Sequence, residues 1–245
     1  MRKRLDLVLV ERGVAPTRSR ARDLIKGAKV LIDGEVCTKA GAEVDEDEMV
    51  TLREGGAAAV SRGGAKLAAA LASFEFDPAG LIALDVGAST GGFTEVLLER
   101  GAAKVYAVDV GHGQLHASLR DNPRVVSFEG CDARSLTPAL IPEPVAAIVA
   151  DVSFISLTKA LSPALALAAP GAWLVALVKP QFEVGRGGVG KGGIVREAAA
   201  RQQAVDAVTA WLSAQEGWRI AGVVPSPIKG GSGNEEYLLG ARCDG

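Results

Sequence analysis

Four charged residues lie where predicted strands or helices begin or end, and together they could activate a hydroxyl group. Asp151 and Lys179 each follow an uncharged apolar run, Glu236 precedes the last such run, and Lys66 begins a predicted helix. A positioned base draws the proton from a hydroxyl, and a lysine can serve if burial or cationic neighbours favour its neutral amine. A surface ion pair is the ordinary alternative for a lone lysine or glutamate. It is a less usual explanation for a lysine that ends an uncharged strand before proline.

Whether these residues converge depends on strand direction. In open α/β sheets, ligands bind outside the carboxyl ends of the parallel strands. Asp151 and Lys179 meet this condition directly. Glu236 joins them only if the final strand runs antiparallel to the others, an arrangement that is common in mixed sheets.

A glycine-rich turn from Asp85 to Thr94 ends a predicted strand and opens a helix. Its glycines would let the backbone turn tightly and approach a ligand at the helix N-terminus. Ser89 stands where a dinucleotide fingerprint requires its second glycine, so that fingerprint is absent. The residues expected to bind a cofactor are Asp85, Gly87, Ser89, Thr90, Gly91, Gly92, Phe93, Asp109, Asp132 and Asp151.

The acidic residues in this set limit the chemistry of the ligand. Asp109 ends the second strand, where a carboxylate suits ribose hydroxyls, and Asp132 follows the third, where it could accept from an adenine amino group. Taken singly, each feature could be only a turn or a loop cap. Together, several carboxylates without a phosphate-binding Lys or Arg favour a ligand without phosphates, such as S-adenosylmethionine. No metal site is predicted, because two histidines and three cysteines without paired spacing offer no ligand cluster.

A second glycine-rich stretch, Gly185 to Lys191, matches most of a phosphate-binding Gly-x-x-x-x-Gly-Lys loop. Gly192 replaces the required Ser or Thr, and residues 180–184 separate the stretch from its strand. We therefore interpret it as a mobile, cationic loop that faces the substrate.

The elements that must position these residues alternate between strand and helix. Continuous apolar runs such as Val145–Ala150 are typical of strands covered on both faces. They predict an α/β fold with a doubly wound, Rossmann-like sheet. Strands are predicted near 81–87, 103–109, 125–128, 145–151, 172–178, 218–224 and 235–242, and helices near 64–74, 91–100, 113–120, 156–168 and 196–215.

The first residues predict a separate small α+β domain with a basic surface. Residues 1–39 hold ten Lys/Arg against five Asp/Glu, although the whole chain has a net charge of −2. A helix is predicted over residues 3–12, a second helix after a Thr17 cap, a hairpin at Asp33-Gly34 and a strand over 49–52. The predicted domains are 1–53 and 63–245, joined by a linker over 54–62. One stripe of the second helix would carry Arg18, Arg22, Lys26 and Lys29, which suits phosphate contacts or else a solvated charged face.

One segment requires a test for membrane insertion. Residues 160–178 carry no charge, but Pro163 and the Pro170-Gly171 pair interrupt them, which predicts a buried helix followed by a buried strand. The first residues lack the apolar stretch of a secretory signal. A cytoplasmic protein is therefore expected.

These motifs resemble the TlyA-type haemolysin and rRNA methyltransferase family, whose catalytic half is similar to the FtsJ-like 2′-O-methyltransferases. The resemblance covers essentially the whole chain, and the N-terminal part looks like the alpha-L RNA-binding fold of the ribosomal-protein-S-four type. Its carriers are Val60-Ser-Arg-Gly-Gly-Ala-Lys-Leu, Asp85-Val-Gly-Ala-Ser-Thr-Gly-Gly-Phe-Thr, Asp109-Val-Gly-His-Gly-Gln-Leu, Asp151-Val-Ser-Phe-Ile-Ser, Lys179-Pro-Gln-Phe-Glu, Ser226-Pro-Ile-Lys-Gly and Gly233-Asn-Glu-Glu-Tyr.

The resemblance implies 2′-O-methylation of ribosomal RNA, at a cytidine ribose, with S-adenosylmethionine as methyl donor and without an implied oligomer. It implies a tetrad of Lys66, Asp151, Lys179 and Glu236, in which Lys179 is the base and the others orient it and the hydroxyl. The family spacing selects Glu236 over the adjacent Glu235. Two positions depart from the family pattern, Ala59 and His112, where an aromatic residue is usual. The residues expected to bind RNA are Arg4, Arg18, Arg20, Arg22, Lys26 and Lys29.

Three other functions compete with this interpretation. A membrane-active haemolysin would need a spanning segment or a basic amphipathic helix, and neither is evident in the sequence. An RNA-binding protein with an inactive α/β half would fail to bind S-adenosylmethionine. A small-molecule methyltransferase would leave the basic N-terminal domain without a role.

Overall fold

The computed structural model describes residues 2–15, 18–26, 28–45, 48–52, 63–185, 188–190, 192–230 and 233–244, without the side chains of Ser19, Arg20 and Asp23. The chain divides into two units, Met1–Ala59 and Val60–Gly245. Several predicted features lie outside the described residues: the Thr17 cap, the Arg20 side chain, the linker over 54–62, and Lys191 of the second glycine-rich stretch.

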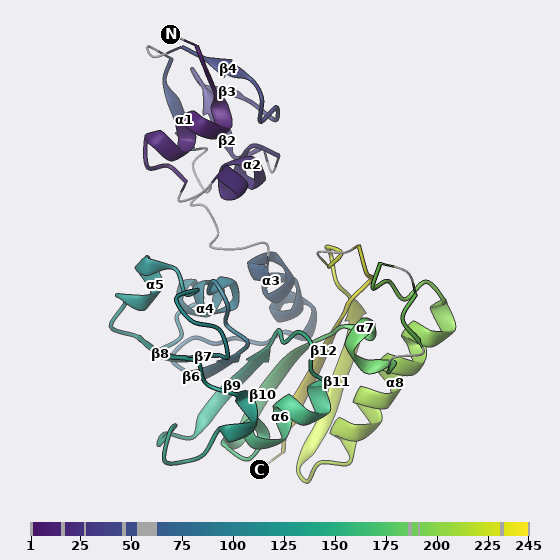
Figure 1. Cartoon of the computed structure of the whole chain (residues 1–245). Coiled ribbons are helices and arrows are strands. Elements are labelled where there is room, and N and C mark those ends of the chain that lie inside the picture. Colours follow the sequence, from purple (N-terminus) through teal and green to yellow (C-terminus); the bar gives the residue numbers. More distant parts are fainter. Residues whose placement is uncertain are drawn as a thin grey trace. The chain divides into compact units, whose positions relative to one another are not determined.

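The first unit packs two helices with small antiparallel sheets (Figure 1). Helices α1 (Leu5–Glu11) and α2 (Arg18–Lys26) bury Leu5, Leu9 and Ile25 in a common core. The predicted hairpin is confirmed, because Ile32 pairs with Glu35 across the Asp33-Gly34 turn. Strand β2 (Val30–Ile32) lies between β3 (Glu35–Val36) and β5 (Val50–Leu52), and β1 (Lys3–Arg4) pairs with β4 (Glu43–Val44).

Both helices of this unit are shorter than predicted. The first begins at Leu5 rather than at residue 3, because Lys3 and Arg4 pair with β4 as a strand. The second ends at Lys26, since Ala28 has a positive φ of 55° and the N–H of Lys29 bonds back to the carbonyl of Leu24. The prediction that Lys29 shares a helical stripe with Arg18, Arg22 and Lys26 is therefore wrong.

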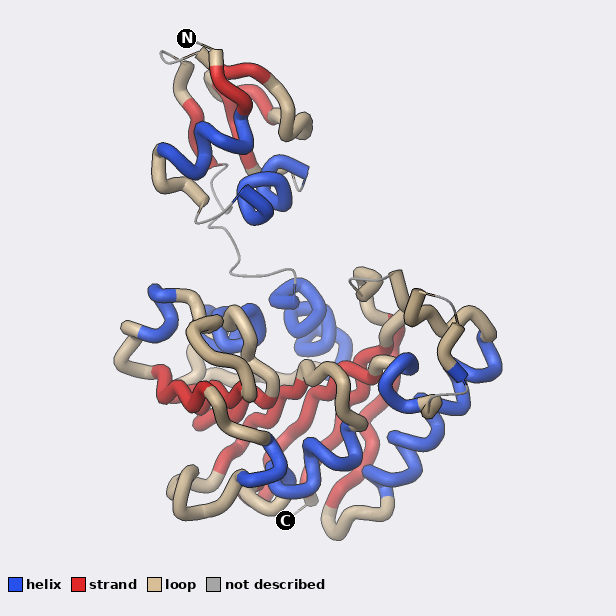
Figure 2. The backbone as a smooth tube through the Cα atoms, in the orientation of Figure 1, coloured by secondary structure: helices blue, strands red, loops and turns tan. Residues whose placement is uncertain are grey.

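The second unit is built on one mixed sheet that is covered by helices on both faces (Figure 2). In the described residues this sheet has seven strands in the order β11-β12-β10-β9-β6-β7-β8. Strand β12 runs antiparallel to both of its neighbours, as convergence of Glu236 with the other charged residues requires. The strands are β6 (Ile82–Val86), β7 (Lys104–Asp109), β8 (Val125–Glu129), β9 (Val145–Ala150), β10 (Ala168–Val178), β11 (Trp218–Pro225) and β12 (Tyr237–Cys243).

The continuous apolar strands are explained by two separate cores. Alternate residues of β9, such as Ile148 and Val149, enter opposite cores. Helices α3 (Gly63–Phe74) and α4 (Gly92–Glu99) pack on one face, and α6 (Leu157–Leu165) and α8 (Ala198–Ser213) pack on the other (Figure 1). The predicted doubly wound fold is confirmed.

Two predicted elements of this unit differ clearly in the structure, and one short helix was not predicted. The helix expected over 113–120 is only α5 (Ala117–Arg120), because the N–H groups of residues 113–115 bond to the Glu129 carboxylate. Strand β10 starts at Ala168, four residues early, with a register shift against β9. A short helix α7 (Pro180–Glu183) follows Lys179, with proline at its first turn.

The uncharged segment from Ala160 to Val178 consists of the end of α6 and strand β10, as predicted. Among the described residues, no helix combines the length and the hydropathy needed to cross a membrane.

Candidate active site

The four predicted catalytic residues lie together at one edge of the sheet. Asp151 and Lys179 follow the carboxyl ends of the adjacent strands β9 and β10. Because β12 is antiparallel and Tyr237 pairs with Val178, Glu236 lies at the same edge. Lys66 reaches this edge from the first turns of α3.

These residues form two ion pairs. The ammonium of Lys66 donates to Oε2 of Glu236 over 2.5 Å, and both side chains are almost fully buried. The ammonium of Lys179 lies 2.6 Å from Oδ1 of Asp151 and donates to the Ser153 hydroxyl over 2.8 Å. Partnered buried ions are held in fixed geometry, because each lysine would be costly to leave alone in this environment.

A small cavity of about 290 Å³ brings three of the four residues together with the glycine-rich turn. Glu236 does not line this cavity, but it accepts the hydrogen bond from Lys66, which does. The lining residues are Gly63, Lys66, Gly87, Ala88, Ser89, Thr90, Gly92, Phe93, Asp151, Ser153, Lys179, Ile228 and Lys229.

A larger cavity of about 1140 Å³ lies beside the small one. Its wall includes Asp109, Asp132 and Gln114. The two cavities share a wall made of Gly87, Ser89, Asp151 and Ser153. A ligand in the larger cavity and a second reactant in the smaller one would therefore meet beside Lys179.

The glycine-rich turn contributes Gly87 and Ser89 to this shared wall. Gly87 has a φ of 86°, and a Cβ at this position would lie 2.6 Å from the carbonyl oxygen of Asp151, a separation that real Cβ atoms do not show. Only glycine permits this approach. The Asp109 carboxylate accepts from the N–H groups of Ser89 and Gly111, over 2.8 and 2.7 Å, and so ties the turn to the loop after β7.

The other predicted cofactor residues are placed in different ways. Thr90, Gly92 and Phe93 line the small cavity, not the large one. In the described part of the chain, Asp85 and Gly91 line neither cavity. Asp132 lines the large cavity and pairs with Arg134, whose hydrogen bond lowers the pKa of Asp132 to about 2.

The large cavity also carries cations that were not expected from the sequence. Arg134 and Lys159 both line it. The expected absence of a phosphate-binding Lys or Arg stays a prediction, because lining the cavity does not make either cation a phosphate ligand. The positive charge of Arg134 is balanced by a bidentate ion pair with Asp132, which accepts hydrogen bonds from its Nε and Nη2.

Asp85 is buried under the glycine-rich turn. Its Oδ2 accepts a 2.6 Å hydrogen bond from the Thr94 hydroxyl, and its Oδ1 has no hydrogen-bond partner among the described residues. Burial raises the pKa of Asp85 to about 7; the Thr94 hydrogen bond opposes this shift, and the Asp151 charge adds to it.

The raised pKa of Asp85 predicts a pH-dependent stability. The unfolded carboxyl releases its proton near pH 3.8 and the folded one near pH 7, so the folded state holds the extra proton between these values. The free energy of unfolding is then expected to decrease from about pH 4 to pH 7 through this group. Asp85→Asn cannot ionise, so its stability relative to the wild type should rise over this window, by on the order of a few kcal/mol.

Urea unfolding at about pH 5 and pH 8 measures this difference. Tryptophan fluorescence reports on the second unit alone, because Trp173, Trp211 and Trp218 all lie there. A difference between wild type and variant that stays constant with pH would contradict burial as the cause of the raised pKa.

Several residues at the site lie within the family motifs, but the sequence did not single them out as site residues. Ser153 contacts Lys179, and Gln114 accepts from the Ser89 hydroxyl over 3.1 Å. Glu183 joins the Lys179 segment to the Asp151 segment, because it accepts from the Ser156 hydroxyl and the N–H of Leu157 at the start of α6. Phe154 is 92% exposed beside the large cavity, with a positive φ of 65°.

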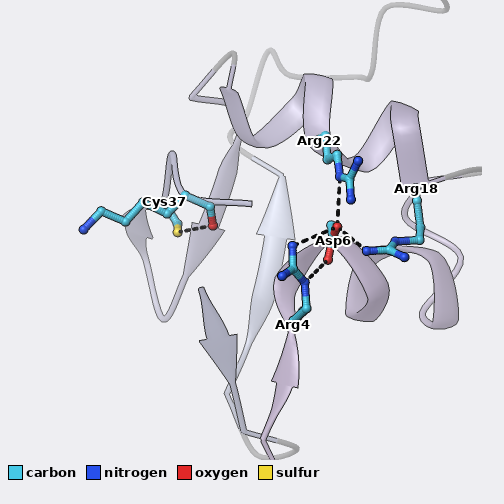
Figure 3. A network of polar contacts seen from close by, with 6 residues as sticks. Arg4, Asp6, Arg18, Arg22 and Cys37 are labelled. Carbon is cyan, nitrogen blue, oxygen red and sulfur yellow. Dashed lines mark hydrogen bonds and ion pairs between the residues drawn. The ribbon is translucent and has the colours of Figure 1, made fainter. Parts of the chain in front are cut away.

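Apart from Arg20, whose side chain is not described, the predicted RNA-binding side chains of the first unit are exposed or half-buried. Arg4, Arg18 and Arg22 gather around the buried carboxylate of Asp6 (Figure 3). Lys26 and Lys29 are exposed. The sequence indicated the arginines but not Asp6, which lies within the apolar pattern of the first helix.

Comparisons with known proteins agree with the two-unit architecture. The FtsJ-like methyltransferase family matches residues 59–243, and the S4 domain family matches residues 3–50. The chain is 50% identical over 243 residues to the 16S/23S rRNA (cytidine-2′-O)-methyltransferase TlyA of Mycobacterium tuberculosis, covering 98% of this chain and 90% of that protein. It is 41% identical over 240 residues to Hemolysin A of Brachyspira hyodysenteriae, covering 96% and 98%.

A solved structure from Streptococcus thermophilus, described as a "putative hemolysin", superposes with a TM-score of 0.75 at 39% identity, over 99% of this chain and 88% of that one. The family match spans most of the chain and includes all four residues of the two ion pairs. The chain therefore belongs to the TlyA family, and it joins an S4 domain to an FtsJ-like methyltransferase domain.

Proposed function

We propose that this protein transfers a methyl group from S-adenosylmethionine to a ribose 2′-hydroxyl of ribosomal RNA, at a cytidine as in the name of the Mycobacterium tuberculosis relative. The observation that carries the proposal is the shared wall between the two cavities, with Lys179 beside it. This shared wall would let one molecule bound in each cavity react with the other beside Lys179. Ribosomal RNA as substrate implies a cytoplasmic enzyme, and the proposal requires no oligomer.

The carboxylates that line the larger cavity suit the hydroxyl and amino groups of S-adenosylmethionine. Asp109 lies where ribose hydroxyls would be chelated, and Asp132 where an adenine amino group would donate. Gly87 lets the glycine-rich turn pack directly against the Asp151 backbone, where a Cβ would clash. When bound, the sulfonium supplies an electrophilic methyl group; the protein supplies the base and the alignment.

In the smaller cavity, Lys179 acts as the general base. In its neutral form, its Nζ would take the proton of the incoming 2′-hydroxyl, and the methyl group would pass from the donor sulfur, which leaves as a thioether, to the ribose oxygen. Asp151 and Ser153 hold this nitrogen toward the cavity. Lys66, fixed by Glu236, donates a hydrogen bond to the ribose and aligns it for the in-line displacement.

The S4 domain supplies the affinity for RNA. Arg4, Arg18, Arg22, Lys26 and Lys29, together with Arg20, are proposed to contact phosphates. These contacts position the RNA without reading its sequence, so binding should weaken as salt concentration rises.

Transfer of tritium from S-[methyl-³H]adenosylmethionine to ribosomal RNA tests the function. The RNA is taken from a strain that lacks this gene, so that the target ribose is unmodified. We expect label in a nucleotide that resists alkaline cleavage on its 3′ side, as a blocked 2′-hydroxyl requires. Label on a base, or no transfer to 16S or 23S RNA, would overturn the proposal. Leakage of liposomes by the protein would instead support a membrane-active haemolysin.

A further inference from the structure

Three arginines of the S4 domain share a single buried acceptor, Asp6. The Asp6 side chain is fully buried in the first turn of α1. Nε of Arg4 lies 3.1 Å from its Oδ1, and Nη2 of Arg18 and Nε of Arg22 lie 2.9 and 3.0 Å from its Oδ2. The three side chains come from different positions on β1 and α2, and Figure 3 shows them converging on one carboxylate.

The contact with Asp6 occupies only some of the N–H donors of each arginine. Their side chains remain 51%, 48% and 47% exposed, in the order Arg4, Arg18, Arg22. A guanidinium carries five N–H donors in a rigid plane, and Asp6 takes one from Arg18, one from Arg22 and two from Arg4. One negative charge among three positive ones leaves the cluster with a net charge of +2.

We propose that Asp6 is a positioning residue for RNA binding, which holds Arg4, Arg18 and Arg22 as one preformed cradle for backbone phosphates. This inference rests on the proposed RNA substrate and identifies how the S4 domain is organised to bind it. Without a central carboxylate, three neighbouring guanidiniums repel one another and must be ordered when RNA binds. With it, their planes are fixed before the phosphates arrive, and each retains donors for a phosphate oxygen.

This proposal and simple electrostatics predict opposite effects for one substitution. Asp6→Asn removes a negative charge from a basic surface while keeping the size of the side chain. If charge alone governed binding, the variant would bind RNA more tightly. If Asp6 positions the arginines, the variant should bind about tenfold more weakly, with a salt slope shallower by about one unit for each phosphate that the arginines no longer neutralise.

The test measures binding of the full chain to transcribed 16S and 23S RNA over a range of salt concentrations. Asp45→Asn is the matched control, because Asp45 is an exposed acid of the same unit that pairs with Arg2; it should bind as tightly as the wild type or slightly more tightly. Circular dichroism establishes that each variant is folded. Weaker binding and a shallower slope for Asp6→Asn alone would support the proposal, and equal or tighter binding by that folded variant would overturn it.

If Asp6→Asn does not fold, a second variant tests the positioning role of Asp6. Arg22→Lys keeps the charge and leaves Asp6 intact, but a single ammonium cannot both pair with Asp6 and present a planar set of donors to phosphate. We expect its binding to weaken several-fold, and unchanged affinity would overturn the proposal. Failure of the wild type to bind either RNA would overturn the RNA substrate itself, whereas wild-type binding with no effect of these variants overturns only the role of Asp6.

Discussion

Lys179→Ala is expected to lower the rate of methyl transfer by about 10²- to 10⁴-fold, the range for loss of a general base. Affinity for S-adenosylmethionine should change little, because Lys179 lines the small cavity and not the larger one proposed for the cofactor. The methyl donor would still bind, but the hydroxyl would keep its proton. Single-turnover transfer of labelled methyl groups and calorimetry with S-adenosylmethionine measure the two effects separately.

Two further substitutions sharpen this prediction. Lys179→Arg keeps the positive charge and the donors toward Asp151, but a guanidinium does not lose its proton, so it should be as inactive as the alanine variant. Lys104→Ala is the control, because Lys104 begins β7 at the opposite end of the strand from Asp109 and pairs with Glu143. Substantial turnover by the arginine variant would show that the lysine acts through its charge and not as a base.

Glu236→Gln is expected both to weaken the fold and to impair methyl transfer. It leaves the buried Lys66 ammonium beside a neutral amide, and the loss of one partner of a buried ion pair costs about 3 kcal/mol. Lys66 would also lose its fixed direction toward the small cavity, and a displaced positioning group can cost about 10²-fold in rate. Urea unfolding and single-turnover rates, measured where the variant is fully folded, check both parts.

The neighbouring residue provides a matched control. Glu235 carries the same side chain one position earlier, but it is about half exposed and pairs with Arg201 and Lys229. Glu235→Gln should therefore change stability by less than about 1 kcal/mol and leave methyl transfer intact. Equal effects of the two substitutions would contradict the assignment of Glu236 to the site.

Much of the fold could be predicted because its signals are local. The apolar run Val145–Ala150 predicts its strand from neighbouring residues, and the Asp33-Gly34 pair specifies its hairpin through turn chemistry alone. Local patterns gave the wrong element where a residue distant in the sequence forms hydrogen bonds with the backbone. The Glu129 carboxylate takes the N–H groups that the helix expected from residue 113 would have used, and pairing with β4 removes Lys3 and Arg4 from the first helix.

The residues of the site could be predicted in part, but the contacts between them could not. The sequence identified Lys66, Asp151, Lys179 and Glu236 as candidates, because they stand where predicted elements begin or end and match the family's motifs. It did not indicate that Lys66 pairs with Glu236 and Lys179 with Asp151. Asp6 was missed altogether, since an acid within an amphipathic helix usually faces water, and only the packing of α1 on α2 shows that it is buried.

By itself, then, the sequence determined most of the strands and helices of the second unit, the family and the residue types available for chemistry, all of which depend on neighbours within a few positions. The tertiary structure alone decided which charges meet. Lys66 and Glu236 are separated by 170 residues, and only the reversal of β12 brings them together. Ion pairs form between groups that packing of the whole chain places within a few ångströms, so no local pattern can specify their partners.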